Sequence, residues 1–536
     1  MINVFLMIWT GVFGLQHSQS AENEASVFGA EILLSYVLDL DSPGTPSATA
    51  PGDFFGFSSA TGDFNGDGID DLAVGIPGWD FNVGVDDTGM VMVVYGTFNG
   101  IPSQSVELTQ SLLLDSDGLE PGDLFGGTLA VGDFDGDGYD DLVVGTENED
   151  VTTDFNDPNN TTFVNAGAIN IFYGSSSGIE TDSDYIHIDI DDPFSGDLLQ
   201  DEARFGHALT VGNFNNDDWD DLVVSVHRQD VVFDDINNPV MDAGMVVIYN
   251  GHPLGIRNTD RDILSQANGA LSGVPEVQDY FGISLVAGNF NNDDYDDLVI
   301  GVPYEDYNGV IDAGIVQVLY GASNGLVFNN EIWSQDDLFG VVLEVNDLFG
   351  FSMTTGNING DGFDDLIVSA AYEDIESLVD AGVVHSILGS SGGLQVASNQ
   401  TVSQNDGTLF GVAETGDVFG LSLHAADLNY DGFDEVIIGT PFEDTAMNAG
   451  GIVHVIFGTA GGMDINDTQH FLSDELDANF GFSLTSGNYG QGSTLTMGKP
   501  GNESNDMDPL AGSIFNLVYK NPDVIFKDGF DQPPKF

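Results

Sequence analysis

Seven Phe-Gly dipeptides of the 536-residue chain recur at similar intervals, and this regular recurrence limits the possible folds more than any other feature. The seven phenylalanines are Phe55, Phe125, Phe205, Phe281, Phe349, Phe419 and Phe480. The first and last are six intervals apart, so one repeat is about 71 residues long. In such arrays each unit buries its faces against its neighbours. We therefore expect seven similar units packed in sequence.

Each repeat carries the signals of several short strands and none of a helix. A β-branched run that ends in Gly, such as 71–75, indicates a buried strand. A Gly-Xaa-Pro corner follows, then a third strand such as 313–321 and a weaker fourth such as 106–114. Four antiparallel strands in each of seven repeats predict an all-β, seven-bladed β-propeller. We expect residues 31–40 to close the ring by pairing with strand 513–519 of the last blade, because closure removes exposed edges.

Six repeats contain an acidic loop directly before the buried strand. Oxygen-bearing side chains occupy loop positions 1, 3, 5 and 9, and position 7 can offer its backbone carbonyl. This spacing lets a tight turn wrap a hard cation, so we predict up to six Ca²⁺ ions. The predicted ligands at positions 1, 3, 5, 7 and 9 are Asp63, Asn65, Asp67, Ile69 and Asp71; Asp133, Asp135, Asp137, Tyr139 and Asp141; Asn213, Asn215, Asp217, Trp219 and Asp221; Asn289, Asn291, Asp293, Tyr295 and Asp297; Asn357, Asn359, Asp361, Phe363 and Asp365; and Asp427, Asn429, Asp431, Phe433 and Glu435.

Two other interpretations of these loops compete with this prediction. An EF-hand needs a bidentate Glu at position 12, where this chain has Val or Ile, and helices on both sides. That interpretation is excluded. A tight Asp/Asn-Gly turn without metal remains an alternative for any single copy. Six copies that all carry an acid at position 9 favour the metal.

The copies differ from one another. Gly at position 6 eases the bend in four loops, whereas the third and fourth loops carry Asp218 and Asp294 there. We expect these two residues to adopt the left-handed conformation and their sites to bind more weakly. Position 8 is always Asp; alternation points its side chain away from the ion, and we interpret it as a turn-capping residue. The seventh repeat has no acid in segment 488–492, so we expect a structural blade without calcium.

Phe-Gly, the acidic loop and Gly-Xaa-Pro together resemble the FG-GAP repeats of the integrin α-subunit propeller. The resemblance covers roughly residues 31–520. It implies that the loops join the first and second strands on one face and that ligands bind the opposite face. The sequence shows no inserted adhesion domain, leg domains, transmembrane helix or disulfides of an integrin. The resemblance therefore implies fold and calcium sites and leaves the ligand open.

Charge restricts the partners. The chain has 88 acidic and 8 basic residues, a formal net charge of −80 and no cysteine. Such self-repulsion destabilises a compact state, and bound calcium would offset part of it. The charge argues against DNA, RNA or anionic membranes as partners. A salt-rich habitat is a competing explanation for the acidic surface.

Residues 1–21 resemble a secretory signal, with an apolar run at 4–15 and small residues near the expected cleavage site. An N-terminal strand or anchor is the alternative. We expect the propeller to span 22–520 and an extended tail to span 521–536. No other segment reaches transmembrane length. Export without cysteine favours a bacterial member of the family, located outside the cell or at its surface.

The sequence predicts an adhesion or interaction module for a protein or glycan ligand and not an enzyme, because no convincing catalytic set is found. Two interpretations fit the long connections 147–165 and 227–242 equally well: they form the surface that contacts the ligand, or they are solvated insertions. Acid pairs such as Glu305-Asp306 recur after the corners, and we interpret them as structural or ion-associated. The rival hypothesis is a calcium-dependent lyase or hydrolase that cleaves polysaccharides with such carboxylates. The oligomeric state is left open.

Overall fold

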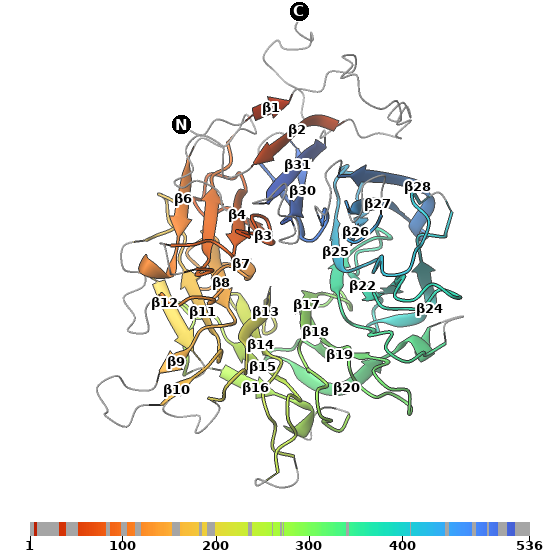
Figure 1. Cartoon of the computed structure of the whole chain (residues 1–536), viewed down its shortest axis with the longest axis horizontal. Coiled ribbons are helices and arrows are strands. Elements are labelled where there is room, and N and C mark those ends of the chain that lie inside the picture. The colour runs from red at the N-terminus through yellow and green to blue at the C-terminus, as the bar shows by residue number, and fades with distance from the viewer. Residues whose placement is uncertain are drawn as a thin grey trace, which may run out of the picture.

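The protein is a ring of seven antiparallel sheets around a central axis, as Figure 1 shows. The computed structural model describes residues 52–81, 86–97, 104–112, 119–152, 161–181, 185–189, 199–233, 238–259, 261–268, 271, 273–338, 342–407, 409–444, 450–473, 479–489, 492–501 and 512–519, and the strand backbone at 5–7 and 32–38. The predicted all-β, seven-bladed propeller is confirmed. Among the described residues, no helix is long and apolar enough to cross a membrane.

The strands of each blade run outwards from the axis in chain order. Blade 1 contains β3 (Ser58–Gly62), β4 (Asp71–Ile76), β5 (Met90–Val94) and β6 (Ser105–Leu108), and blade 2 contains β7 (Thr128–Gly132), β8 (Asp141–Thr146), β11 (Ala168–Phe172) and β12 (Tyr185–Asp189). Blade 3 contains β13 (Phe205–Gly212), β14 (Asp221–Val226), β15 (Met245–Tyr249) and β16 (Arg261–Leu264), and blade 4 contains β17 (Ser284–Gly288), β18 (Asp297–Val302), β19 (Ile315–Tyr320) and β20 (Val327–Trp333). Blade 5 contains β21 (Met353–Gly356), β22 (Asp365–Ala370), β23 (Val383–Leu388) and β24 (Gln395–Val402), and blade 6 contains β25 (Ser422–Ala426), β26 (Glu435–Thr440), β27 (Ile452–Thr459) and β28 (Gly462–Leu472).

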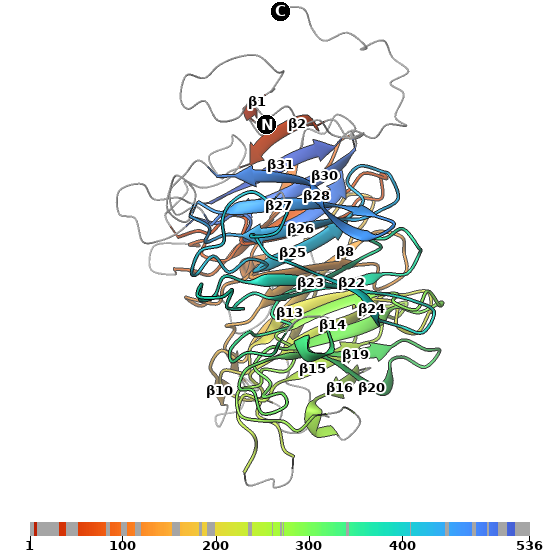
Figure 2. The same cartoon turned by 90° about the vertical axis from the view of Figure 1, so that its right-hand side faces the viewer.

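Blade 7 joins the two ends of the chain. Its strands are β29 (Leu484–Asn488), β30 (Ser493–Lys499) and β31 (Ser513–Tyr519), and β2 (Ile32–Leu38) pairs antiparallel with β31. The predicted closure by an N-terminal strand is therefore confirmed, and Figure 2 shows β2 lying beside β31. The first strands of neighbouring blades contact one another all round the axis, including β29 against β3.

The N-terminus adds one more strand. β1 (Phe5–Met7) pairs with β2 at the outer edge of blade 7, although it falls within the predicted signal segment. Cleavage of that segment and secretion stay predictions. The rest of residues 1–21 and the predicted tail 521–536 lie outside the described residues.

The core is divided among the blade boundaries. Seven clusters of buried hydrophobic residues are found in the described part of the chain, one between each pair of neighbouring blades. Each Phe-Gly phenylalanine lies in the cluster between its own blade and the preceding one, as Phe125 does between blades 2 and 1. The N–H of Phe125 also donates to the carbonyl of Thr88 in that preceding blade at 3.2 Å. The repeated phenylalanine therefore joins blades by packing and by a backbone hydrogen bond.

A second anchor was not predicted. Position 2 of each acidic loop carries a large apolar residue that packs into the core shared with the following blade; these are Phe64, Phe134, Phe214, Phe290, Ile358 and Leu428. All six are almost completely buried. Each acidic loop is thus fixed to a blade boundary by its second residue.

The long connections 147–165 and 227–242 contain some order. The first includes a small hairpin of β9 (Val151–Thr152) and β10 (Thr162–Phe163), and in the second Val231 bridges to Val240. Short 3₁₀-helices follow the fourth strands of blades 1, 3 and 4: η1 (Gln110–Leu112), η2 (Gln266–Asn268) and η3 (Gln335–Asp337).

Candidate metal centres

All six acidic loops connect the first strand of a blade to the second. In blade 1, β3 ends at Gly62 and β4 begins at Asp71, the ninth loop position. The ninth residue is also the first residue of the second strand in the other five blades: Asp141, Asp221, Asp297, Asp365 and Glu435. Because the blades are repeated around one axis, the six loops lie at one end of the propeller. This confirms the placement that the resemblance implied.

The second loop brings its acids closest together. The carboxylates of Asp133, Asp135 and Asp141 offer oxygen atoms that all lie within 4.8 Å of one another. The N–H of Asp137 donates to Asp133 Oδ1 and Asp135 Oδ1, both at 3.1 Å. The N–H of Tyr139 donates to Asp137 Oδ1 at 3.0 Å. Three of the predicted side-chain ligands therefore converge, and the fourth, Asp137, is held in the same turn.

The other loops repeat this arrangement. In the third to sixth loops the N–H of the fifth residue donates to the side-chain oxygens of the first and third residues; the fifth residues are Asp217, Asp293, Asp361 and Asp431. In the first loop the N–H of Asp67 donates to Asp63 Oδ1 at 3.0 Å, and Asn65 Nδ2 lies 3.1 Å from Asp71 Oδ2. Positions 1, 3 and 5 thus face a shared interior in each loop.

The carboxylate at position 9 is buried at the base of its loop. Asp141 accepts the N–H of Phe134 at 3.0 Å and the N–H of Gly174 at 2.9 Å. Burial, together with the charges of Asp135 and Asp133, raises the pKa of Asp141 to about 8, although the two backbone hydrogen bonds lower it. Burial likewise raises the pKa to about 7 in Asp71, Asp221, Asp297 and Asp365 and to about 9 in Glu435. Without a cation nearby, a large share of these acids holds protons at neutral pH.

The donor set fits a hard cation. The loops contain no Lys or Arg, so no side chain of their own neutralises the clustered acids. Their ligands are carboxylate and amide oxygens, which Ca²⁺ prefers. Asp365 is completely buried and its Oδ2 has no hydrogen-bond partner in the described part of the chain. Such an oxygen is suited to a metal ion.

The third and fourth loops differ from the prediction. Asp218 and Asp294 do not adopt the left-handed conformation, whereas Gly138 at the same position has φ 88°. In the second loop the N–H of Gly138 turns inward to the first carboxylate at 3.0 Å. In the third loop, the amide nitrogen of Asn213 instead donates to the carbonyl of the fifth residue at 2.9 Å. The peptide between positions 5 and 6 is therefore turned over, so the expectation for these two aspartates was wrong.

The aspartate at position 8 caps a turn, as predicted, and the turn belongs to the preceding loop. Asp140 Oδ2 accepts the N–H of Asp63, the first residue of the preceding loop, at 2.7 Å, and the N–H of Asp140 donates to the carbonyl of Asp63 at 3.3 Å. We call this double contact the loop clasp. It recurs for Asp220 with Asp133, Asp296 with Asn213, Asp364 with Asn289, Asp434 with Asn357 and Asp70 with Asn488. Position 8 therefore caps the loop of the neighbouring blade and not its own.

Position 7 contributes its side chain as well. Tyr139 covers Gly66 of the preceding loop, where an added Cβ would lie 2.5 Å from the tyrosine ring. Trp219 Nε1 donates to the carbonyl of Asp135 at 3.1 Å. The use of the position-7 carbonyl as a ligand stays a prediction, but its side chain joins neighbouring loops.

A second set of acids is buried at the opposite end of the propeller. Gln404 Nε2 donates to Glu443 Oε2 at 2.7 Å, and the N–H of Glu414 donates to Asp417 Oδ2 at 2.5 Å. Burial raises the pKa of Asp417 to about 6 and that of Glu443 to about 8. The same contacts occur in blades 4 and 5, around Glu305 and Glu373. The first acid of each acid pair in these blades is therefore hydrogen-bonded to a Gln amide, which agrees with a structural role for the pairs.

Comparison with known proteins identifies the repeat. The sequence matches the FG-GAP repeat over residues 55–94, 125–168, 281–319, 349–387 and 419–456. These ranges fall in blades 1, 2, 4, 5 and 6. Blade 7 lacks the acidic loop, and blade 3 has Ala203 where the matched blades have an Asp two residues before Phe-Gly.

Relatives fall into two groups. The chain is 26% identical to rat phosphatidylinositol-glycan-specific phospholipase D over 413 residues, which is 74% of this chain and 44% of the relative. It is 27% identical to Drosophila melanogaster integrin alpha-PS2 over 221 residues, 39% of this chain and 14% of the relative. The chain therefore spans less than half the length of these curated relatives. The predicted bacterial origin stays a prediction.

A solved structure, Bacillus licheniformis rhamnogalacturonan lyase PL11, matches with a TM-score of 0.39 and 12% identity over 91% of this chain and 80% of that chain. At this score no conclusion about fold or function is drawn from it.

The prediction that the chain is not an enzyme is overturned by these comparisons. Relatives from rat, mouse and cattle that match about three quarters of the chain are named as phospholipases D. No convincing catalytic set is visible in the sequence, but its repeats are shared with proteins named for an enzymatic activity.

Proposed function

Because the chain is an FG-GAP repeat protein with an integrin α-like propeller, we propose that it is an extracellular calcium-binding module that holds protein or glycan ligands. Calcium is assigned to the six acidic loops. Ligands are assigned to the opposite end of the propeller, where the connections between second and third strands lie.

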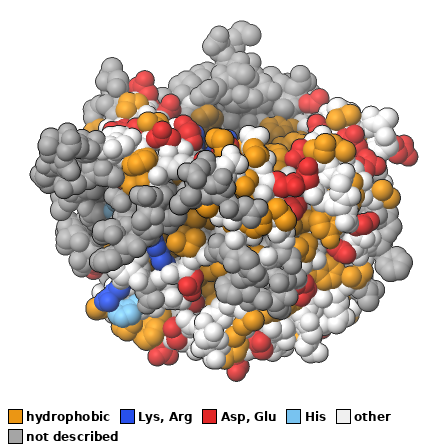
Figure 3. All heavy atoms as spheres, turned by 90° about the horizontal axis from the view of Figure 1, so that it is seen from below, with side chains coloured by type: hydrophobic (Ala, Val, Ile, Leu, Met, Phe, Trp, Pro, Cys, Tyr) orange, Lys and Arg blue, Asp and Glu red, His pale blue; other side chains and the backbone are white. Residues whose placement is uncertain are grey.

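One observation carries the calcium assignment. The oxygens of Asp133, Asp135 and Asp141 converge within 4.8 Å around the buried carboxylate of Asp141, and no Lys or Arg among the described residues forms an ion pair with them. Six to eight oxygens at flexible distances are typical of Ca²⁺, and one loop offers side chains at four positions and a carbonyl at a fifth. The surface shown in Figure 3 carries acidic side chains in many places and basic ones in few. Calcium at millimolar concentration, as found outside cells, would fill sites of low affinity.

The ligand assignment has support at the opposite end. The connection after β14 exposes apolar side chains: Val232 is 51% exposed, Phe233 is 40% exposed and Met241 is 57% exposed. Exposed apolar residues that lie close together are common at interaction sites. A net charge of −80 disfavours nucleic acids and anionic membranes as the ligand.

Calorimetric titration of the chelator-treated chain tests the calcium sites. We expect up to six equivalents of Ca²⁺ to bind and Asp137→Ala to remove one. The matched control is Asp336→Ala, which removes an exposed acid from η3, outside the loops. An unchanged number of sites after Asp137→Ala would contradict the assignment to the second loop.

Retention of ligands tests the interaction role. The chain, immobilised with calcium, is offered an array of glycans and a panel of extracellular matrix proteins. We expect at least one to be retained and its retention to fall after chelation. Retention of none would contradict this role and leave the calcium assignment intact.

A second candidate function follows from the phospholipase relatives: a contribution to the hydrolysis of phosphatidylinositol-glycan anchors. The chain spans 44–46% of these relatives, so this activity is carried over as a proposal only. Incubation with a phosphatidylinositol-glycan-anchored protein and calcium tests it directly. Release of the soluble protein would support the candidate, whereas binding without release would favour the interaction role alone.

A further inference from the structure

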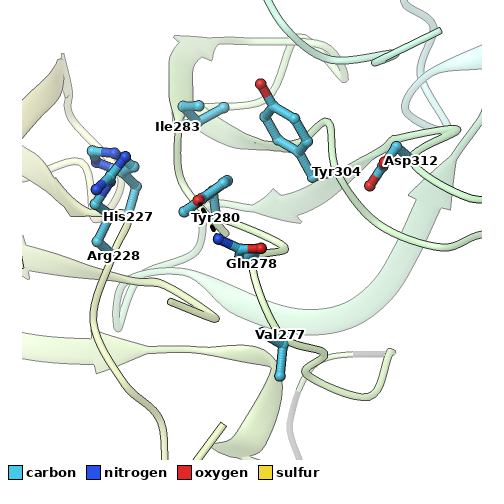
Figure 4. A pocket seen from close by; sticks show the side chains of 8 residues that line it. All are labelled: His227, Arg228, Val277, Gln278, Tyr280, Ile283, Tyr304 and Asp312. Carbon is cyan, nitrogen blue, oxygen red and sulfur yellow. Dashed lines mark hydrogen bonds between the residues drawn. The ribbon is translucent and has the colours of Figure 1, made fainter. Parts of the chain in front are cut away.

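A pocket of about 430 Å³ lies at the junction of blades 3 and 4, at the end of the propeller opposite the acidic loops (Figure 4). His227 and Arg228 directly follow β14, and Tyr304 follows the corner after β18. Tyr280 comes from the entry to blade 4, and Asp312 comes from the connection between β18 and β19. In the view of Figure 4, Arg228 and Asp312 lie on opposite sides of the pocket with Tyr280 between them.

Arg228 is the unusual residue of this pocket. Its guanidinium lies 5.6 Å from the centre of the Tyr280 ring and has no ion pair or side-chain hydrogen bond in the described part of the chain. The chain has only eight Lys and Arg residues against 88 acids. A guanidinium offers five N–H donors in a planar fork that matches a carboxylate. An arginine in so acidic a protein that forms no close ion pair with any described residue therefore indicates an anionic ligand group.

Two other basic side chains near the pocket already have acidic partners. Arg204 forms an ion pair with Glu202 at 2.7 Å, and His207 contacts Glu147 at 2.5 Å. Burial and the neighbouring cations lower the pKa of His227 to about 2, so its imidazole is neutral. His227 is 6% exposed, and its Nδ1 has no hydrogen-bond partner among the described residues. This ring therefore has an unused polar atom and carries no charge.

The remaining lining suits a sugar. The rings of Tyr280 and Tyr304 are 5.2 Å apart at 85°, so one presents its edge to the face of the other. Gln278 Nε2 donates to the Tyr280 hydroxyl at 3.1 Å, which leaves its amide oxygen to accept. Asp312 can accept hydroxyl hydrogens but would repel a phosphate or a second carboxylate. Aromatic rings, mixed donors and acceptors and a single unpaired cation together match a hydroxylated ring with one acid group.

We propose that this pocket binds a sugar residue that bears a carboxylate, such as the hexuronic acid unit of an acidic glycan. The carboxylate lies on the guanidinium of Arg228, and the sugar ring lies against Tyr280 and Tyr304. The inference rests on the proposed interaction function and names the ligand class for it.

The net charge gives this site an unusual salt dependence. A chain of charge −80 repels an acidic glycan over long range, and the carboxylates of Glu147, Glu202 and Asp242 also lie within electrostatic range of Arg228. Dissolved salt screens this repulsion more than the short-range contact with Arg228. Binding should therefore tighten between about 20 mM and about 150 mM salt, whereas ordinary ion-pair binding weakens over that range.

The test measures the affinity of the calcium-loaded full chain for oligosaccharides of galacturonic and glucuronic acid. Neutral oligosaccharides of galactose and glucose, a glutamate-rich peptide and inorganic phosphate serve as comparison ligands. We expect binding of at least one acidic oligosaccharide and a loss of about ten- to hundredfold in Arg228→Gln, because a charge-assisted hydrogen bond is removed. Arg228→Lys should recover part of the affinity, and Tyr304→Ala should weaken binding where Tyr304→Phe largely retains it.

Arg257→Gln is the matched control. It removes the same charge from the connection between β15 and β16, at the acidic-loop end, and should leave the affinity unchanged. Melting temperature and calcium stoichiometry confirm that each variant is folded. Binding that is the same in Arg228→Gln and the parent chain would overturn the site but not the interaction function. Tighter binding of the peptide or phosphate than of every acidic oligosaccharide, or no acidic oligosaccharide bound, would overturn the ligand class.

Discussion

At the scale of single residues, the two consecutive acids at positions 8 and 9 of each loop make different contacts. Asp141 at position 9 faces its own loop, is buried and accepts two backbone N–H groups. Asp140 at position 8 faces the preceding blade and forms the loop clasp with Asp63. Because adjacent side chains of an extended segment point to opposite sides, two neighbouring acids can serve two blades. The pair of consecutive acids therefore links each acidic loop to the preceding one.

The loop clasp predicts a stability effect that is independent of calcium. Asp140→Ala leaves the N–H of Asp63 without its carboxylate, and we expect a loss of about 1–3 kcal/mol in the free energy of unfolding. Urea denaturation in excess calcium measures this change. Asp336→Ala on η3 is the control and should change stability by less than about 0.5 kcal/mol. If both substitutions lowered the free energy of unfolding by the same amount, the loop clasp would not stabilise the fold and the prediction would be wrong.

The buried acids at position 9 predict a pH effect in the absence of calcium. In the folded chain their pKa values are raised to about 7 to 9, whereas in the unfolded chain they titrate near pH 4. The folded state then binds more protons than the unfolded state between these values. Its stability is therefore highest at low pH in this window and falls as pH rises from about 4 to about 9.

Melting curves at pH 5 and pH 8, with chelator and with excess calcium, distinguish the contribution of the loop acids to pH-dependent stability from that of other buried acids. The chelated chain should melt at a lower temperature at pH 8 than at pH 5. Calcium should raise the melting temperature more at pH 8, because its ligands must be deprotonated. The buried acids around Glu443 lose stability with rising pH in both conditions, so the difference between the two series reports on the loops. A calcium effect that is equal at both pH values would be inconsistent with these ligands.

At the scale of strands, β2 has the largest predicted consequence because, among the described strands, it joins the N-terminal segment to β31 of blade 7. It pairs with β31, so removing it exposes the edge of that strand. A chain that starts at Glu22 keeps β2 and loses β1, and we expect it to melt like the full chain. A chain that starts at Asp39 lacks both strands and should melt at a lower temperature and be cut by protease within β31. Identical melting of the two chains would show that β2 does not close the ring.

The fold was predictable from the sequence because each blade repeats the same local signals. Phe-Gly, the acidic loop and the Gly-Xaa-Pro corner mark the first three strands of a blade. Segment 31–40 precedes the first Phe-Gly in the way that a fourth strand precedes each later one, and this position predicted the closing strand. The loop clasp was not predictable from one repeat, because Asp140 and Asp63 are 77 residues apart. The inverted peptide before Asp218 depends on the amide of Asn213, whose orientation the sequence does not state. The pocket around Arg228 combines residues of two blades and carries no repeated motif.

At the scale of the whole molecule, charge and ring closure act together. Seven hydrophobic clusters and six loop clasps connect the blades, but 88 acids repel one another throughout the ring. The boundary between blades 6 and 7 lacks the clasp, since the seventh repeat has no acid to offer the sixth loop. We therefore expect this boundary to open first when calcium is removed. Hydrogen exchange with and without chelator should show the greatest gain at β25 and β29, and a uniform gain in all blades would contradict this.

A crystal structure grown in calcium, with anomalous scattering measured for the ion, tests the central claim most directly. We predict one ion in each of the six acidic loops, coordinated by oxygens at about 2.3–2.6 Å, and none at Asn488 in the seventh repeat. Water alone between Asp133, Asp135 and Asp141 at saturating calcium would contradict the account.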